Sequence, residues 1–212
     1  MVPIMKTFSY EMERIYDQIH EMGKLTLQQM NLIQENFEMI TSKKSQEIFL
    51  MDQVVDKKDE EIQREILNLM VVQTPLPKEL ESLTVMLRMS REFERIGDQM
   101  VNIAESFQHI HFDAPHSTIA NVFEMLNHTI FMHQETLKLL GEYEKSRAEN
   151  IRISDEKVDS LFHEFREELP SLVRKYDTNI DSLIQFFLIS RYLERSADHL
   201  VNISKRITLI KE

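Results

Sequence analysis

Hydrophobic residues recur every three or four positions along most of the chain, which is the period of an α-helix with one apolar face. Short breaks divide this pattern into six stretches. Pro75 and Pro77 end the second stretch, and Pro170 lies inside the fifth, where it should kink or shorten the helix. The pattern therefore predicts six long helices, which cover about residues 8–37, 48–69, 78–107, 117–143, 151–176 and 179–210.

The third and sixth stretches repeat one another. With a shift of 100 residues, segment 82–103 aligns with 182–203, and ten of the 22 positions are identical. The second and fifth stretches both carry the pattern D-x-x-V-D. Such repetition indicates a duplicated structural unit. We expect an all-α fold of two tandem three-helix bundles related by internal duplication, the first covering residues 1–110 and the second 117–212.

The composition agrees with a helical protein and excludes several functions. Three glycines and five prolines in 212 residues are too few for a turn-rich β fold or a glycine-built phosphate loop. The absence of cysteine excludes disulfides and thiolate metal sites and fits a cytoplasmic protein. A net charge of −11 disfavours nucleic acid as a partner. No apolar run reaches the roughly 20 residues needed to span a bilayer, so any membrane association should be indirect.

The polar residues that both copies share are mostly acids, spaced four positions apart on one helical face. Neither core packing nor solubility requires the same acid twice at the same spacing. Converging carboxylates must stay hydrated, take up protons, pair with cations or bind metal, and their oxygens favour Mg²⁺, Mn²⁺, Ca²⁺ or oxidised iron. The candidate metal ligands are Asp52, Asp56, Glu94, Asp98 and Asn102 in the first copy, and Asp155, Asp159, Glu194, Asp198 and Asn202 in the second.

Two other interpretations of the acids remain open. The acids would line a hydrated seam between the two helices that carry them, or repeated arginines would neutralise their charge. Asp59 lies in an apolar stripe where the second copy has Phe162, so it is either an extra ligand or a hydrated defect. The repeated arginines are Arg91, Arg95, Arg191 and Arg195.

The histidines suggest further sites. His163 opens the segment HEFREEL, which is similar to a histidine phosphotransfer box but lacks its threonine, so we expect a partly exposed helix residue there. His199 follows Asp198, and we expect it to face solvent rather than to join a metal site. Three histidines near the link between the two copies would form either a transition-metal clip or a solvated turn: His109, His111 and His116.

The pattern S-R-x-x-E-R-x-x-D-x-x-V-N-I occurs twice, each time after a helix with D-x-x-V-D, and it resembles the PhoU family of phosphate-signalling proteins. The resemblance implies a cytoplasmic, dimeric protein of two three-helix bundles. It also implies that the ten residues given above bind multinuclear iron or zinc clusters. The loop PLPKELE departs from the family pattern, with Glu79 and Glu81 in place of an aspartate and an arginine.

The function that this resemblance implies is regulation of phosphate uptake. Such proteins connect the ATPase of a phosphate ABC transporter with a sensor histidine kinase, keep the phosphate-starvation response off, and are not known as enzymes. Alternatives are an accessory protein of another phosphate permease, or a metal-dependent phosphate hydrolase or storage bundle. A carboxylate-bridged di-iron enzyme is disfavoured, because none of the eight histidines has a glutamate three residues before it.

Overall fold

The computed structural model describes residues 2–110, 115–175 and 180–211. They form six long helices and no strand, so the predicted all-α class is confirmed. None of these helices is apolar over a sufficient length to cross a bilayer. The helices are α1 (Val2–Glu35), α2 (Ser42–Gln73), α3 (Pro77–Phe107), α4 (His116–Gly141), α5 (Lys145–Lys175) and α6 (Ile180–Lys211).

The turn between α2 and α3 shows how the sequence ends one helix and begins the next. Thr74 follows α2 in the left-handed region, with φ of 45°, and Pro75 cannot continue the helix. Pro77 begins α3, and the carboxylate of Glu79 accepts a hydrogen bond of 2.7 Å from the backbone N–H of Leu76. Glu79, at which the loop departs from the family pattern, therefore caps α3.

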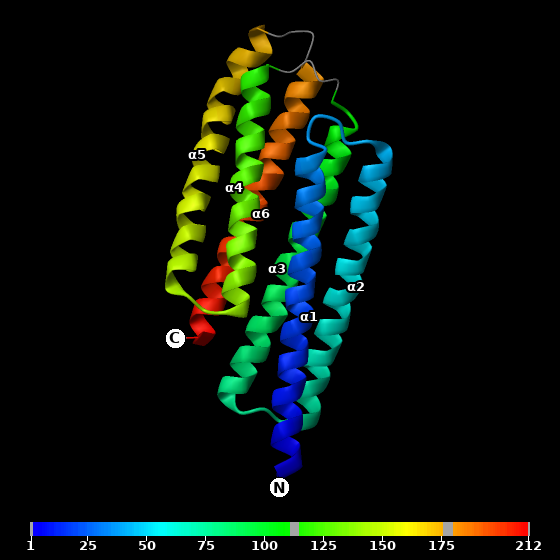
Figure 1. Ribbon diagram of the computed structural model, residues 1–212, viewed down its shortest axis with the longest axis vertical. Coiled ribbons are helices and arrows are strands. Elements are labelled where there is room, and N and C mark those ends of the chain that lie inside the picture. The colour runs from blue at the N-terminus through cyan, green and yellow to red at the C-terminus, as the bar shows by residue number, and fades with distance from the viewer. Residues whose placement is uncertain (1, 111–114, 176–179, 212) are drawn as a thin grey trace.

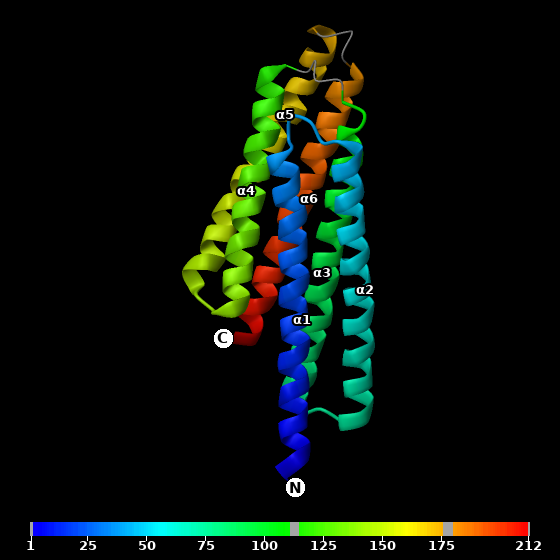
Figure 2. The ribbon, with the colours of Figure 1, turned by 45° about the vertical axis from the view of Figure 1, so that its right-hand side comes forward.

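The helices form two groups of three that lie side by side (Figures 1 and 2). Within each group, α1–α3 and α4–α6, the helices pack against one another, and the groups meet along α3 with α6 and α1 with α4. Helices α1–α3 extend beyond α4–α6 at the end of the molecule where the N-terminus lies. The predicted two-bundle fold is confirmed, and the buried side chains of both bundles form one continuous core. The division at residues 110 and 117 stays a prediction.

Polar contacts link the two groups inside this core. The hydroxyl of Tyr16 on α1 donates a hydrogen bond of 2.7 Å to the carbonyl oxygen of Leu140 on α4. Thr26 Oγ1 lies 2.8 Å from Nε2 of the fully buried His133. Burial lowers the pKa of His133 to about 3, because water cannot solvate the charged ring. These contacts set the register of α1 against α4.

Pro170 does not end α5. The helix continues past Pro170 to Lys175, so the expected shortening does not occur. Proline removes one backbone hydrogen bond, and this exposed residue lies near the end of a helix whose earlier turns are packed. The expected boundaries at Tyr176 and Asn179 lie outside the described residues.

Candidate metal centre

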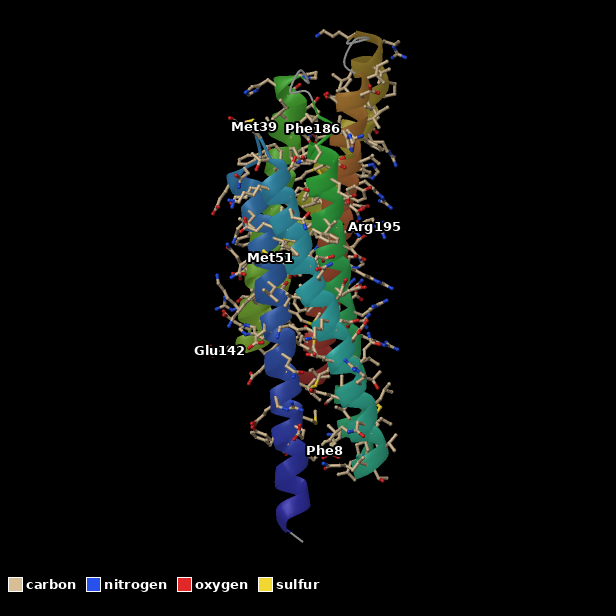
Figure 3. The ribbon with its side chains drawn as sticks, turned by 90° about the vertical axis from the view of Figure 1, so that its right-hand side faces the viewer. Phe8, Met39, Met51, Glu142, Phe186 and Arg195 are labelled. Atoms are coloured by element: carbon tan, nitrogen blue, oxygen red, sulfur yellow. The ribbon has the colours of Figure 1, made fainter. Side chains whose placement is uncertain are left out.

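Three aspartates gather where α2 packs against α3. Figure 3 shows the molecule with its side chains from the side on which α2 lies. Asp52 and Asp56 lie one turn apart on α2, and Asp98 approaches them from α3. Each offers a carboxylate oxygen, and these atoms lie within 4.8 Å of one another. Across the three described ranges, no other set of three Asp, Glu, His or Cys side chains is this close. We call Asp52, Asp56 and Asp98 the first acidic cluster.

Asp52 is the buried member of the first acidic cluster. Its exposed fraction is 7%, and its Oδ1 atom has no hydrogen-bond partner among the described residues. Burial, followed by the charges of Asp56 and Asp98, raises the pKa of Asp52 to about 7. A buried carboxylate oxygen without a partner is costly, and a bound cation would satisfy it.

The neighbouring carboxylates also have raised pKa values. Burial first, and then the charge of Asp98, raises the pKa of Asp56. Burial also raises the pKa of Glu94, although the nearby charge of Arg91 opposes the rise. Two carboxylates about 5 Å apart repel by roughly 3 kcal/mol at an effective dielectric constant of about 20. The first acidic cluster therefore favours protons or a cation in its midst.

Gly97 on α3 provides the space that Asp52 occupies. A Cβ atom at position 97 would overlap Oδ1 of Asp52. On the α1 side lies Gln29, which is fully buried and whose amide donates a hydrogen bond of 3.1 Å to the carbonyl oxygen of Ile48. The side chain of Gln29 partly offsets the rise in the pKa of Asp52. Asp52 is thus enclosed by α1, α2 and α3.

Asp59 lies on the same helix and is only 1% exposed. Its carboxylate accepts hydrogen bonds from Ser90 Oγ at 2.8 Å, from Arg91 Nη1 at 3.0 Å and from the Gln63 amide. Arg91 also pairs with Glu94 Oε1 at 3.1 Å. Asp59 is therefore a buried, fully paired carboxylate rather than a hydrated defect. It anchors Arg91 beside the first acidic cluster.

The second copy brings its acids together at the seam of α5 and α6. We call Asp155, Asp159 and Asp198 the second acidic cluster. Burial, and then the charges of Asp159 and Asp198, raises the pKa of Asp155 to about 6. Burial also raises the pKa values of Asp159 and Glu194. Asp155 is only half-buried, so this cluster is more open than the first.

The second copy holds its repeated arginine differently. Arg191 Nη1 lies 2.6 Å from both carboxylate oxygens of Glu194. Phe162 takes the place of Asp59, and the guanidinium carbon of Arg191 lies 5.7 Å from the centre of its ring. An aromatic face thus supports the arginine that a buried carboxylate holds in the first copy.

Asn102 and Asn202 follow Asp98 and Asp198 by one helical turn, and both asparagine side chains are partly exposed. Together the donors are hard oxygen atoms, the set that suits Mg²⁺, Mn²⁺, Ca²⁺ and oxidised iron. Zinc also accepts carboxylate ligands. The buried Oδ1 atom of Asp52 is the oxygen of this set that lacks a partner among the described residues.

The histidines singled out in the sequence lie in different places. His163 is exposed on α5, one turn after Asp159 of the second acidic cluster, and its charge opposes the rise in the pKa of Asp159. His109 and His116 line two different surface hollows. His111 lies outside the described residues. The described part of the chain offers no support for a histidine clip at the link.

His199 contradicts its prediction, because it is buried between α3 and α6 rather than facing solvent. Its Nδ1 lies 2.7 Å from Oε2 of the buried Glu92, and Arg206 Nη2 donates a hydrogen bond of 3.0 Å to Glu92 Oε1. Burial alone would raise the pKa of Glu92, but these two partners lower it. Sequence analysis missed Glu92 because the second copy has Tyr192 there.

Comparison with known proteins agrees with this architecture. The PhoU domain model matches the chain twice, over residues 19–107 and 122–207. The first match contains the first acidic cluster, and the second match contains the second. The chain belongs to the PhoU family. Each three-helix group therefore corresponds to one PhoU repeat, as the internal repetition predicts.

PhoU proteins from several bacteria are similar over most of the chain. A phosphate-specific transport system accessory protein PhoU homolog from Clostridium acetobutylicum is 24% identical over 199 residues, which cover 93% of this chain and 91% of that protein. The Deinococcus radiodurans homolog of the same description is 26% identical over 161 residues, 76% of each chain.

Two crystal structures have the same fold. PhoU from Pseudomonas aeruginosa has a TM-score of 0.89 and 20% identity, and the match covers 96% of this chain and 98% of that one. The phosphate transport system regulatory protein PhoU from Streptococcus pneumoniae has a TM-score of 0.86 and 20% identity, with 96% of both chains covered. At this identity, the likeness establishes the six-helix PhoU fold.

Proposed function

We propose that this PhoU-family chain is a metal-binding regulator of phosphate uptake and of the phosphate-starvation response. It acts as a non-catalytic adaptor between the ATPase of a phosphate ABC transporter and a sensor histidine kinase. Family membership and the names of its relatives support the role in phosphate transport. The single observation that supports metal binding is the first acidic cluster, with its buried and unpartnered Asp52 oxygen.

The metal ions would be held by residues from two helices in each repeat. In the first repeat the first acidic cluster would hold the cation, with Glu94 and Asn102 beside it. In the second repeat the second acidic cluster would do so, with Glu194 and Asn202. When bound, the metal supplies positive charge that neutralises the carboxylates and cross-links the two helices. This would stiffen each seam and change the charge that a partner protein meets.

The outer surface suits an adaptor. A hollow between α1 and α2 is lined by apolar side chains that include Leu25 and Met51. Exposed apolar side chains also occur along α2, and such surfaces are typical of protein interaction sites. They belong to Phe49, Leu50, Val54, Leu67 and Val71.

Metal binding is tested with two double variants. The first-cluster variant combines Asp52→Asn with Asp98→Asn, and the second-cluster variant combines Asp155→Asn with Asp198→Asn. Each protein is stripped with a chelator, reloaded with Mn²⁺, Zn²⁺ or iron, desalted and subjected to elemental analysis. We expect the wild type to bind metal at both clusters and each variant to lose the metal of its own cluster.

The control for this experiment removes two acids that lie elsewhere. Glu144 and Glu149 are exposed and pair with Arg147 and Arg152. The double variant Glu144→Gln with Glu149→Gln changes the net charge as much as either cluster variant does. It should bind as much metal as the wild type. Equal metal content in all four proteins would contradict the proposed metal sites.

The regulatory role is tested in the source organism. A strain that lacks the gene carries a reporter for a phosphate-starvation promoter and grows with excess phosphate. We expect the reporter to be active in this strain, off when the wild-type gene is returned, and active again with the first-cluster variant. A reporter that stays off without the gene would contradict the proposal.

Partners and assembly are measured on the tagged wild-type chain. We expect the ATPase of a phosphate ABC transporter and a sensor histidine kinase to co-purify with it. Recovery of a different phosphate permease, without these two proteins, would instead support the accessory role with that permease. Light scattering should give twice the mass of one chain, because we also propose a homodimer; a monomer would contradict that part alone.

A further inference from the structure

Beside each acidic cluster lies a small residue that carries no ligand atom and that differs between the two copies. In the aligned segments ERIGD and ERSAD, Gly97 of α3 corresponds to Ala197 of α6. Both positions are buried, and both directly precede an aspartate of an acidic cluster. The acids themselves have the same spacing in the two copies. The two copies therefore differ by one methyl group at the position next to this aspartate.

Gly97 leaves the volume in which the carboxylate of Asp52 lies. A methyl group at position 97 would overlap Asp52 Oδ1 and would also lie 3.5 Å from Oε1 of Gln29. Because Gln29 is fully buried and fills the space on the α1 side, the carboxylate cannot retreat inward. We therefore expect a methyl group here to turn Asp52 outward, toward solvent.

The second acidic cluster has the arrangement that a methyl group should produce. Ala197 is 1% exposed, so its methyl group is packed at the seam. Asp155, which corresponds to Asp52, is half-buried instead of buried. Within the described residues, the second cluster does not reach the 4.8 Å grouping of ligand atoms that the first cluster has.

We propose that Gly97 is the positioning residue that makes the first acidic cluster the tighter of two cation sites, and that Ala197 sets the lower affinity of the second. This inference rests on the proposed metal binding and assigns a role to residues that donate no ligand. A site whose oxygens are already gathered needs less rearrangement when the cation binds, and so binds it more tightly.

The experiment exchanges the two residues, with one cluster at a time left intact. Gly97→Ala is made in the second-cluster variant, which retains only the first site. Ala197→Gly is made in the first-cluster variant, which retains only the second site. After removal of bound metal, Mn²⁺ is titrated into each protein, and the electron paramagnetic resonance signal of free Mn²⁺ gives the affinity and the number of sites.

We expect Gly97→Ala to weaken Mn²⁺ binding about tenfold or more, which is the size of effect that residues supporting metal ligands commonly have. Ala197→Gly should strengthen binding at the second site roughly threefold or more, within the same range of supporting effects. The melting temperature of the metal-free Gly97→Ala protein should stay the same or rise, because alanine favours the helix and Asp52 regains water. General damage to packing would lower it.

A second glycine provides the packing control. A methyl group at Gly23 on α1 would lie 2.6 Å from Leu137 Cδ2 and 2.9 Å from Phe93 Cζ, neither of which belongs to a cluster. Gly23→Ala should therefore lower the melting temperature and leave the Mn²⁺ affinity unchanged. This separates a change in helix packing from a change in the position of Asp52.

The inference is overturned if Gly97→Ala leaves the affinity unchanged. It is also overturned if the affinity falls together with a loss of melting temperature as large as that of Gly23→Ala. If the wild-type chain binds Mn²⁺ at both clusters and only the effect of Gly97 is missing, this inference fails alone. If the wild-type chain binds no Mn²⁺, the proposed metal sites fail with it.

Discussion

The two acidic clusters share their acids and differ in what supports them. In the first, Gly97 leaves space for the carboxylate of Asp52 between α2 and α3, and the buried Asp59 accepts a hydrogen bond from Arg91. In the second, an alanine fills the seam and the ring of Phe162 lies under the repeated arginine. The acids that form the clusters are thus the same in both repeats, while the residues that pack behind these acids differ. Differences between the two sites should therefore arise from supporting residues.

The largest effect should come from removing the repeated arginine, which has a buried carboxylate partner in the first copy only. Arg91→Ala leaves the carboxylate of Asp59 buried without its guanidinium partner, so the free energy of unfolding should fall by roughly 2–3 kcal/mol. Arg191→Ala removes an exposed pair with Glu194 and should cost less than about 1 kcal/mol. Urea unfolding followed by circular dichroism measures both losses. Equal losses would mean that the two arginines are held alike.

A smaller effect should appear in the pH dependence of stability without metal. The pKa of Asp52 is raised to about 7, above that of an unfolded aspartate, so the folded state binds the proton more tightly. The stability from this proton is complete below about pH 4 and is lost as the pH rises through about 7. Asp52→Asn should therefore be more stable than the wild type at about pH 8, on the order of 2 kcal/mol once partial hydration is allowed for, and no more stable at about pH 4.

The second cluster provides the comparison for this measurement. Asp155→Asn should show the same sign, with a smaller gain that is complete at a lower pH, because the pKa of Asp155 is raised only to about 6. Thermal unfolding with a chelator present, measured across this pH range, checks both variants. If Asp155→Asn gained as much stability as Asp52→Asn, the difference in burial between the two aspartates would have no effect on stability.

The smallest effect concerns a pair of serines that both repeats contain and that are fully buried in both. Both hydroxyls lie within hydrogen-bond distance of a carbonyl oxygen in their own helix, Leu87 at 3.0 Å from Ser90 and Phe187 at 2.7 Å from Ser190. Ser90 Oγ also donates to the buried Asp59 at 2.8 Å. Ser90→Ala should cost about 1–2 kcal/mol, and Ser190→Ala less than about 0.5 kcal/mol. Urea unfolding of the two variants would contradict this if Ser190→Ala cost as much.

The periodicity and repetition of the sequence were sufficient to predict six helices, two repeats and the paired acids. These features are local, because residues spaced four apart share a helical face whatever packs against that face. Exact helix limits were harder to predict. Pro170 leaves α5 unbroken because it lies near the end of a helix whose earlier turns are held by packing, which the spacing of residues in one helix does not describe.

The tertiary structure alone decided the burial and the partners of the key side chains. Asp52 is buried because α3 presents a glycine opposite it, and His199 is buried because α6 meets Glu92 on α3. Asp59 fits an apolar stripe because Ser90 and the following arginine reach it from the next helix. In each case the deciding atoms come from a different helix. A sequence shows which residues share a face, but the atoms opposite that face depend on how the helices pack.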